Sequence, residues 1–313
     1  MAFSAAIVFP GQGSQHLNML SQGGILDIAQ SSEYLYLVDS CSDLIQEDFF
    51  GLIEKGPEDI LHKTSVTQPV LLLTSYFHFL KLLDNVKVEP TLFAGHSLGE
   101  YTALVAAKSL NIEDALKLVR QRGELMELAP KGSMAAILGM DHSAIKGICE
   151  EISADDSDSV QCANLNSPVQ TVISGLQHSV ERAQNLCLEH GAKRAIKLKV
   201  SIASHSSLMK QAAESFYEYL STISIDSPQN RLIHNVGCTE ATSTQEIVEL
   251  LAMQLYSPVE WVKTTNIIKE SGVMAIECGP GKVLGGLMKS NGIQTYFSTS
   301  DTQFYEKITN HDK

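Results

Sequence analysis

A glycine-flanked turn between an apolar strand and a helix of small residues constrains the fold of this chain more than any other feature. Residues 91–94 read as a short strand, Gly95-His-Ser-Leu-Gly99 as the turn, and residues 99–107 as a helix rich in alanine. The glycines permit a sharp reversal of the backbone. Strands and helices alternate around this turn, with a strand at 5–9 and helices at 69–80 and 113–128. This alternation predicts an α/β protein with a parallel sheet covered by helices.

The middle of the chain follows a different pattern. It reads strand, helix, strand, strand, helix, strand, at residues 134–138, 142–152, 160–165, 169–174, 177–190 and 193–200. This order is the ferredoxin-like arrangement. The alternation then resumes, with helices at 206–220, 244–255 and 261–271 and strands at 231–236 and 273–277. We therefore expect a large α/β subdomain, residues 1–129 and 201–313, interrupted by a small ferredoxin-like subdomain, residues 130–200.

Composition narrows the classes of function. The 313 residues include 36 acidic and 23 basic ones, a formal net charge of −13. Nucleic-acid backbones and anionic membranes attract basic residues, so we expect neither as a partner. The longest charge-free apolar stretch, residues 65–80, is too short and polar to cross a bilayer. The start of the chain lacks the basic region of a signal peptide. Six cysteines without metal-ligand spacing predict free thiols, no metal site and a reducing, cytoplasmic location.

Ser97 lies at the centre of the glycine-flanked turn, in a G-x-S-x-G string. After a strand and before a helix, this string favours a nucleophile elbow, in which the serine hydroxyl is exposed at the helix N-terminus. The alternative is a glycine-rich turn with an incidental serine. An activated serine needs a base. Among ten histidines His205 is the best candidate, because it follows a strand-like stretch where sites gather at a sheet edge. No aspartate is identifiable by spacing as a third member.

Arg122 is the most informative charged residue. On the helix of residues 113–128 it falls on the apolar stripe, between Leu118 and Val119 on one side and Leu125 and Met126 on the other, and therefore points inward. A planar guanidinium in such a place suits a carboxylate. The partner is either the carboxylate of a substrate or a structural Asp or Glu in an internal ion pair.

Two glycine-rich loops are candidates for anion binding. Gly11-Gln12-Gly13 follows the first strand, and its backbone N–H groups suit half of an oxyanion hole. Gly279-Pro-Gly-Lys282 superficially suggests a phosphate-binding loop, but it lacks the upstream glycine and the Ser or Thr after the lysine. The sequence therefore excludes nucleotide binding there.

Seven strings in order carry a resemblance to a known family: Phe9-Pro-Gly-Gln-Gly-Ser-Gln15, Gly95-His-Ser-Leu-Gly-Glu-Tyr101, Arg122-Gly123, Asn164-Leu-Asn-Ser-Pro168, Ser204-His205, Gln254-Leu-Tyr-Ser-Pro258 and Gly279-Pro-Gly-Lys-Val-Leu284. The chain resembles the malonyl-CoA:acyl carrier protein transacylases of type II fatty acid synthesis, whose acyltransferase family is shared with polyketide synthases. The resemblance spans nearly the whole chain. It implies an α/β-hydrolase-like large subdomain and a ferredoxin-like small one.

The resemblance also implies residue roles. Ser97 is the nucleophile that carries the malonyl group as an ester, and His205 is the general base and acid, held by a backbone carbonyl at the position of Gln254. The remaining implied site residues are the oxyanion-hole N–H groups of Gln12 and Leu98, Arg122 for the malonyl carboxylate, and Asn166 lining the site. The substrates are malonyl-CoA and an acyl carrier protein bearing phosphopantetheine, with no further cofactor.

Some alternatives stay open. Ile202-Ala-Ser-His205 differs from the strict malonyl pattern and resembles endings that accompany α-branched malonyl units in polyketide acyltransferases. The other functions considered are a trans-acting polyketide synthase acyltransferase, an acyl-thioester hydrolase and a non-catalytic carrier-binding protein. We expect a monomer. Because carrier proteins and this chain are both acidic, docking requires a local basic patch; the candidates are Lys193, Arg194, Lys197, Lys199, Lys210, Lys282 and Lys289.

Overall fold

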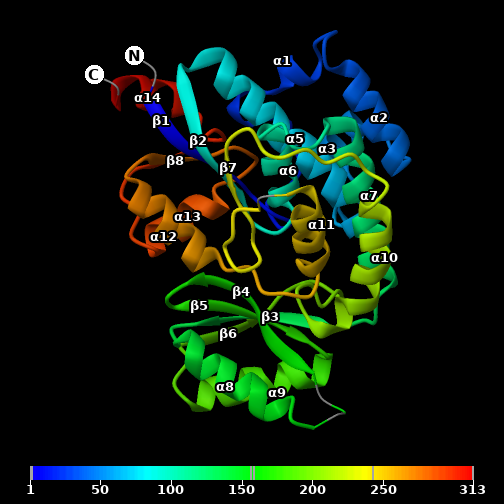
Figure 1. Cartoon of the computed structure of the whole chain (residues 1–313), viewed down its shortest axis with the longest axis vertical. Helices are drawn as coiled ribbons and strands as arrows, with labels where there is room; N and C mark the ends of the chain where they lie inside the picture. Colours follow the sequence, from blue (N-terminus) through cyan, green and yellow to red (C-terminus); the bar gives the residue numbers. More distant parts are fainter. Residues whose placement is uncertain (1–2, 156, 158, 242, 312–313) are drawn as a thin grey trace.

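A computed structural model describes residues 3–155, 157, 159–241 and 243–311. The chain forms two layered bodies, one around a parallel sheet and one around an antiparallel sheet. Figure 1 shows the parallel sheet with its helices in the upper part and the antiparallel sheet below it, with α8 and α9 underneath. Both predicted architectures are therefore confirmed.

The parallel sheet has five strands in the order β7-β2-β1-β8-β9, and each neighbouring pair runs parallel. In chain order the strands are β1 (Phe3–Phe9), β2 (Val88–Gly95), β7 (Arg231–Ile233), β8 (Met274–Glu277) and β9 (Tyr296–Ser298). The central strand β1 is buried on both faces from Ala5 to Phe9. This explains its unbroken apolar sequence, since a parallel sheet is covered by helices on both sides.

Helices cover the two faces of this sheet. The larger core packs Ile7 and Phe9 of β1 against one set of helices: α2 (Leu35–Ile45), α3 (Phe49–Lys55), α5 (Thr64–Asn85), α6 (Gly99–Ala106), α7 (Ile112–Leu128), α10 (Lys210–Leu220) and α11 (Thr244–Met253). The opposite face, with Ala6 and Val8, packs against α12 (Trp261–Ser271) and α13 (Val283–Ser290). Alternate residues of one strand thus serve two cores.

The antiparallel sheet has the order β4-β5-β3-β6. Its elements follow the chain as β3 (Ser133–Leu138), α8 (His142–Ile152), β4 (Val160–Ser167), β5 (Gln170–Gly175), α9 (Gln177–Glu189) and β6 (Arg194–Lys197). Helices α8 and α9 cover one face, where Ile145 of α8 and Val180 of α9 belong to one core with Ile137 of β3. On the other face Met134, Ala136 and Val172 line a cleft. The exact limits of the two subdomains stay a prediction.

Several predicted bounds were wrong. The strand expected at 193–200 ends at Lys197, because after Leu198 the chain leaves the sheet and lines the cleft. The strand expected at 231–236 ends at Ile233, because His234 and Asn235 bond to Glu100 instead of a neighbouring strand. The structure also contains elements near both ends of the chain that were not predicted: η1 (Met19–Gly24), α1 (Leu26–Ala29), α2, α3, α4 (Glu58–Leu61), α13, β9 and α14 (Phe304–His311).

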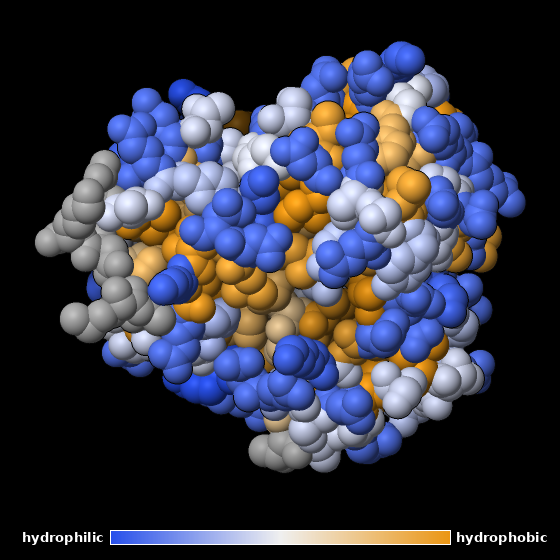
Figure 2. All heavy atoms as spheres, turned by 90° about the horizontal axis from the view of Figure 1, so that it is seen from above, coloured by the Kyte–Doolittle hydropathy of each residue, from blue (hydrophilic) through white to orange (hydrophobic). Residues whose placement is uncertain are grey.

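Of the described helices, none is long and apolar enough to cross a bilayer. Seen from above, hydrophilic side chains cover much of the molecule and apolar ones are exposed between them (Figure 2). The exposed apolar residues include Leu26, Leu35 and Tyr36 of α1 and α2.

Candidate active site

The glycine-flanked turn connects β2 to α6 and carries Ser97 at its tip. Ser97 has a left-handed backbone, φ 53°, a conformation that non-glycine residues adopt at a cost and that clusters at functional sites. The turn needs both flanking glycines. A Cβ on Gly95 would lie 1.9 Å from the carbonyl carbon of Gly99, and one on Gly99 would lie 2.1 Å from the carbonyl oxygen of Phe9. The helix therefore starts in direct contact with the sheet, and Ser97 lines the cleft.

His205 lies beside Ser97, as predicted. Its Nε2 is 2.9 Å from the Ser97 hydroxyl. Its Nδ1 lies 2.8 Å from the carbonyl oxygen of Gln254 and 3.2 Å from that of Ser257. Because carbonyl oxygens only accept, Nδ1 carries the proton and Nε2 is left as the acceptor for the serine proton. A carbonyl thus orients the base, and this accounts for the missing acidic third member.

Burial keeps the imidazole of His205 neutral. The side chain is 2% exposed, and burial, aided by the nearby charge of Arg122, lowers the pKa of His205 to about 3. Desolvation disfavours the charged form of a base. His205 is therefore ready to accept a proton across the whole physiological pH range.

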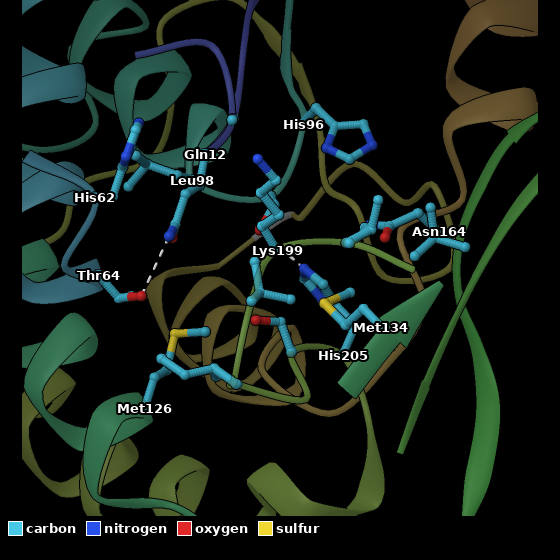
Figure 3. A pocket seen from close by; sticks show the side chains of 18 of the residues that line it. Gln12, His62, Thr64, His96, Leu98, Met126, Met134, Asn164, Lys199 and His205 are labelled. Carbon is cyan, nitrogen blue, oxygen red and sulfur yellow. Dashed lines mark hydrogen bonds between the residues drawn. The ribbon is translucent and has the colours of Figure 1, made fainter. Parts of the chain in front are cut away.

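The backbone N–H groups of Gln12 and Leu98 are the predicted oxyanion hole. Both residues line the cleft, and Leu98 directly follows Ser97. Within the described part of the chain, neither N–H donates to a hydrogen bond. The Gln12 side chain is fixed by a bond from its Nε2 to the Thr64 hydroxyl, 3.2 Å (Figure 3). Two free N–H groups beside a serine suit an oxyanion.

Arg122 is buried, with 1% of its surface exposed. Its Nη2 donates to Gln254 Oε1 at 2.9 Å, and its guanidinium carbon lies 5.3 Å from the centre of the Tyr101 ring. Its Nε has no hydrogen-bond partner among the described residues. The internal ion pair that the sequence left open does not form between the residues that the structure describes. A buried cation without an anion is unusual, and its position at the cleft suits an anionic ligand.

The cleft has a volume of about 870 Å³ and lies between the two sheets. Its labelled side chains come from both bodies: Gln12 and His96 from the loops that follow β1 and β2, Met134 and Asn164 from the antiparallel sheet (Figure 3). Asn166 also lines it, with Oδ1 2.9 Å from Nε2 of His96. Lys63, Lys131 and Lys199 add positive charge to the lining. Such a cleft, apolar with a few polar groups, is typical of a small-molecule site.

The structure brings all seven predicted site residues together, but it also adds two that the sequence analysis missed. Asn235 Oδ1 accepts from the backbone N–H of Ser97 at 2.7 Å, and the carboxylate of Glu100 accepts from Asn235 N at 3.0 Å. The only signal in the sequence was a glutamate at the start of an otherwise small and apolar helix.

The other chemical expectations concern metals and thiols. No group of three or more His, Cys, Asp or Glu residues in the described ranges has the arrangement to hold a metal ion. All six cysteines are free.

Comparison with known proteins places the chain in a family. Residues 6–284 match the family model of the acyl transferase domain. The chain is 44% identical to the malonyl CoA-acyl carrier protein transacylase of Haemophilus influenzae and 41% identical to that of Escherichia coli, in each case over 91% of both proteins.

Solved structures agree. A malonyl CoA-acyl carrier protein transacylase from Coxiella burnetii superposes with a TM-score of 0.91 at 39% identity, over 99% of this chain and 98% of the other. A malonyl-transacylase in complex with a type II polyketide synthase acyl carrier protein superposes with a TM-score of 0.90 at 38% identity, over 99% and 100%. The chain therefore belongs to the acyl transferase domain family and, within it, to the malonyl CoA-acyl carrier protein transacylases.

Proposed function

We propose that this protein transfers a malonyl group from malonyl-CoA to the phosphopantetheine thiol of an acyl carrier protein, through an ester on Ser97, for fatty acid synthesis. One observation carries this proposal. The Ser97–His205 pair and the buried, carboxylate-free Arg122 belong to the same cleft. A nucleophile beside an unpaired cation suits an acyl group that ends in a carboxylate.

The acylation step follows from the geometry. Ser97 Oγ attacks the thioester carbonyl carbon while His205 Nε2 takes the hydroxyl proton. The N–H groups of Gln12 and Leu98 receive the negative charge that develops on the carbonyl oxygen. The carbon–sulfur bond then breaks, and His205 returns its proton to the departing CoA sulfur. The carrier thiol reverses these steps: His205 takes its proton, the sulfur attacks the ester, and Ser97 regains a hydrogen.

Arg122 selects the acyl group. Its guanidinium pairs with the free malonyl carboxylate, and Asn166 lines the same cleft near His96. The apolar lining from Met126, Met134 and Val172 limits the access of water to the ester. Ala203 is buried two residues before His205, in the segment whose ending resembles that of acyltransferases that use α-branched malonyl units. Comparison of methylmalonyl-CoA with malonyl-CoA as acyl donor measures whether this enzyme accepts such units.

The transfer itself is tested with a carrier protein. The purified enzyme, malonyl-CoA and carrier protein are mixed, and malonyl-carrier is measured by mass spectrometry. We expect product with phosphopantetheine-loaded carrier and none with the unloaded form. Release of free malonate as fast without carrier as with it would indicate a hydrolase instead. The chain is also similar to the enzyme solved with a polyketide carrier protein. The rate of malonyl transfer to fatty acid and to polyketide carrier proteins decides between those two pathways.

Carrier docking uses positive charge near the cleft. Of the predicted basic residues, Lys199 lines the cleft, whereas Lys197 is paired with Glu181 and Lys282 with Asp301. We expect Lys199→Glu to raise the KM for carrier protein, because carrier proteins are acidic. The control is Lys146→Glu, on α8 and exposed. Equal KM values for the two variants would exclude Lys199 from docking.

Two general properties belong to the same proposal. We propose that the enzyme acts as a monomer in the cytoplasm, where its free thiols stay reduced. Sedimentation of the purified protein at working concentration measures the first property, and a concentration-dependent dimer would contradict it.

A further inference from the structure

Glu100 is a buried carboxylate that the proposed reaction does not use. It lies in the first turn of α6, three residues after Ser97, and is 1% exposed. Glutamate is almost never this buried without partners. Its Oε1 lies 2.7 Å from His234 Nδ1. Its Oε2 accepts from the backbone N–H of Asn235 at 3.0 Å and from Nε2 of Gln254 at 2.6 Å. The carboxylate thus joins two segments that are distant in sequence.

The first of these segments holds the turn that carries the nucleophile. The Asn235 side chain accepts from the Ser97 N–H at 2.7 Å and donates to the carbonyl oxygen of Gly95 at 2.6 Å. One amide therefore bonds to the turn on both sides of His96. By fixing the Asn235 backbone, Glu100 fixes this bonding and hence the position of the Ser97 hydroxyl.

The second segment holds the cation and the base. Gln254 Nε2 donates both to Glu100 and to the carbonyl oxygen of Ser97, the latter at 3.0 Å. Since both neighbours of this nitrogen are acceptors, the other end of the amide, Oε1, has to face Arg122. The Gln254 carbonyl oxygen also accepts from His205. Without the carboxylate, one of the acceptors that hold the amide in this orientation is lost.

We propose that Glu100 is a positioning residue for acyl transfer, whose hydrogen bonds through Gln254 orient Arg122 and through Asn235 hold the Ser97 turn. The inference rests on the proposed function and deepens it. We call the hydrogen bonds that run from Glu100 through Gln254 the Gln254 arm, and those that run through Asn235 the Asn235 arm. The Gln254 arm acts on acyl selectivity, and the Asn235 arm acts on the rate of acylation for every acyl group.

The test uses two variants of similar size. Glu100→Met removes every acceptor. Glu100→Gln keeps one oxygen that accepts from Asn235 and Gln254. Its amide nitrogen can donate to Nδ1 of His234 when the imidazole of His234 carries its proton on Nε2. The rate of ester formation on the enzyme is measured with malonyl-CoA and with acetyl-CoA, which lacks the carboxylate. We expect Glu100→Met to lower the malonyl-to-acetyl ratio of kcat/KM about tenfold, as expected for one impaired charged hydrogen bond. Glu100→Gln should keep the wild-type ratio.

Three controls make the result specific. Glu277→Met alters another fully buried glutamate, which accepts from the N–H groups of Leu284 and Gly285, and should keep the ratio. In an Arg122→Ala background, Glu100→Met should change the ratio no further, because the two act through one path. Asn235→Ala should slow malonyl and acetyl transfer equally. If Glu100→Met does not fold, this variant still tests the Asn235 arm.

The outcomes separate the inference from the proposed function. A folded Glu100→Met with the wild-type ratio, a Glu100→Gln as impaired as Glu100→Met, or an Asn235→Ala that alters the ratio or keeps the wild-type rate would overturn the inference. If the wild type forms no malonyl ester, the proposed function fails, and the inference fails with it.

Discussion

Arg122→Ala tests the assignment of the substrate carboxylate. The guanidinium is 1% exposed and is held by Gln254 and by the face of Tyr101, so its place in the free enzyme is fixed before substrate binds. Removing one partner of a buried charge pair costs about 3–5 kcal/mol. At 1.36 kcal/mol for each tenfold change, kcat/KM for malonyl-CoA should fall roughly a hundredfold to a few thousandfold.

Acetyl-CoA provides the comparison, because its acyl group has no carboxylate to lose. Acetyl transfer should fall much less, and the malonyl-to-acetyl ratio should therefore decrease by about the same factor as malonyl transfer. The rate of ester formation is followed by rapid quenching and intact-protein mass spectrometry. Thermal unfolding checks that the variant is folded.

Arg120→Ala is the matched control on the same helix. Arg120 is more exposed and pairs with Glu124 at 2.8 Å, an arrangement worth about 0–1 kcal/mol. It should leave the ratio unchanged. An equal loss of malonyl and acetyl transfer in Arg122→Ala would show that Arg122 is a structural residue and does not bind the substrate carboxylate.

Three further predictions concern the turn and the buried histidines. Gly95→Ala should lower the free energy of unfolding by more than about 4 kcal/mol, since its Cβ would lie 1.9 Å from a backbone carbon. The methyl group of Gly286→Ala on α13 meets no atom of the described residues within 4 Å outside its chain neighbours and its own helix backbone. This variant should gain up to about 1 kcal/mol; urea unfolding measures both, and similar values would contradict the steric argument. The pKa of His205 and that of His78 are each lowered to about 3 by burial, whereas in the unfolded chain they are about 6.5. Below pH 6.5 the unfolded chain therefore binds more protons, and the free energy of unfolding should fall by up to about 1.4 kcal/mol per pH unit for each histidine; a pH-independent value between 7 and 5.5 would contradict this. For the same reason the rate of acylation in the folded enzyme should stay level from pH 7.5 to 5.5, and an inflection near pH 6.5 would show that His205 titrates normally.

The parts of the site that the sequence predicted depend on local signals. The turn at Ser97 could be predicted because the strand, the two glycines and the helix that form it follow one another within a few residues. The inward direction of Arg122 follows from helical periodicity alone, because apolar residues three and four positions away fall on the same face. The ferredoxin-like order was equally local, since its helices show clear apolar stripes.

The parts that the sequence did not predict depend on distant partners. Glu100 and Asn235 are 135 positions apart, and neither shows its burial in its immediate neighbours. Three of the helices between Leu26 and Leu61, α1, α3 and α4, carry too few turns for a periodic pattern. The strand ending at Lys197 was predicted too long, because alternation between lysine and apolar residues continues after the sheet ends. There Lys199 lines the cleft instead.

The most direct test of the central claim is the mass of the enzyme after reaction with malonyl-CoA. We expect the wild type to gain one malonyl group, peptide mapping to place it on Ser97, and phosphopantetheine-loaded carrier protein to remove it. Ser97→Ala should remain unmodified, because the attacking oxygen beside His205 is gone. A malonyl group that persists in Ser97→Ala, or a wild type that gains none, would contradict the account.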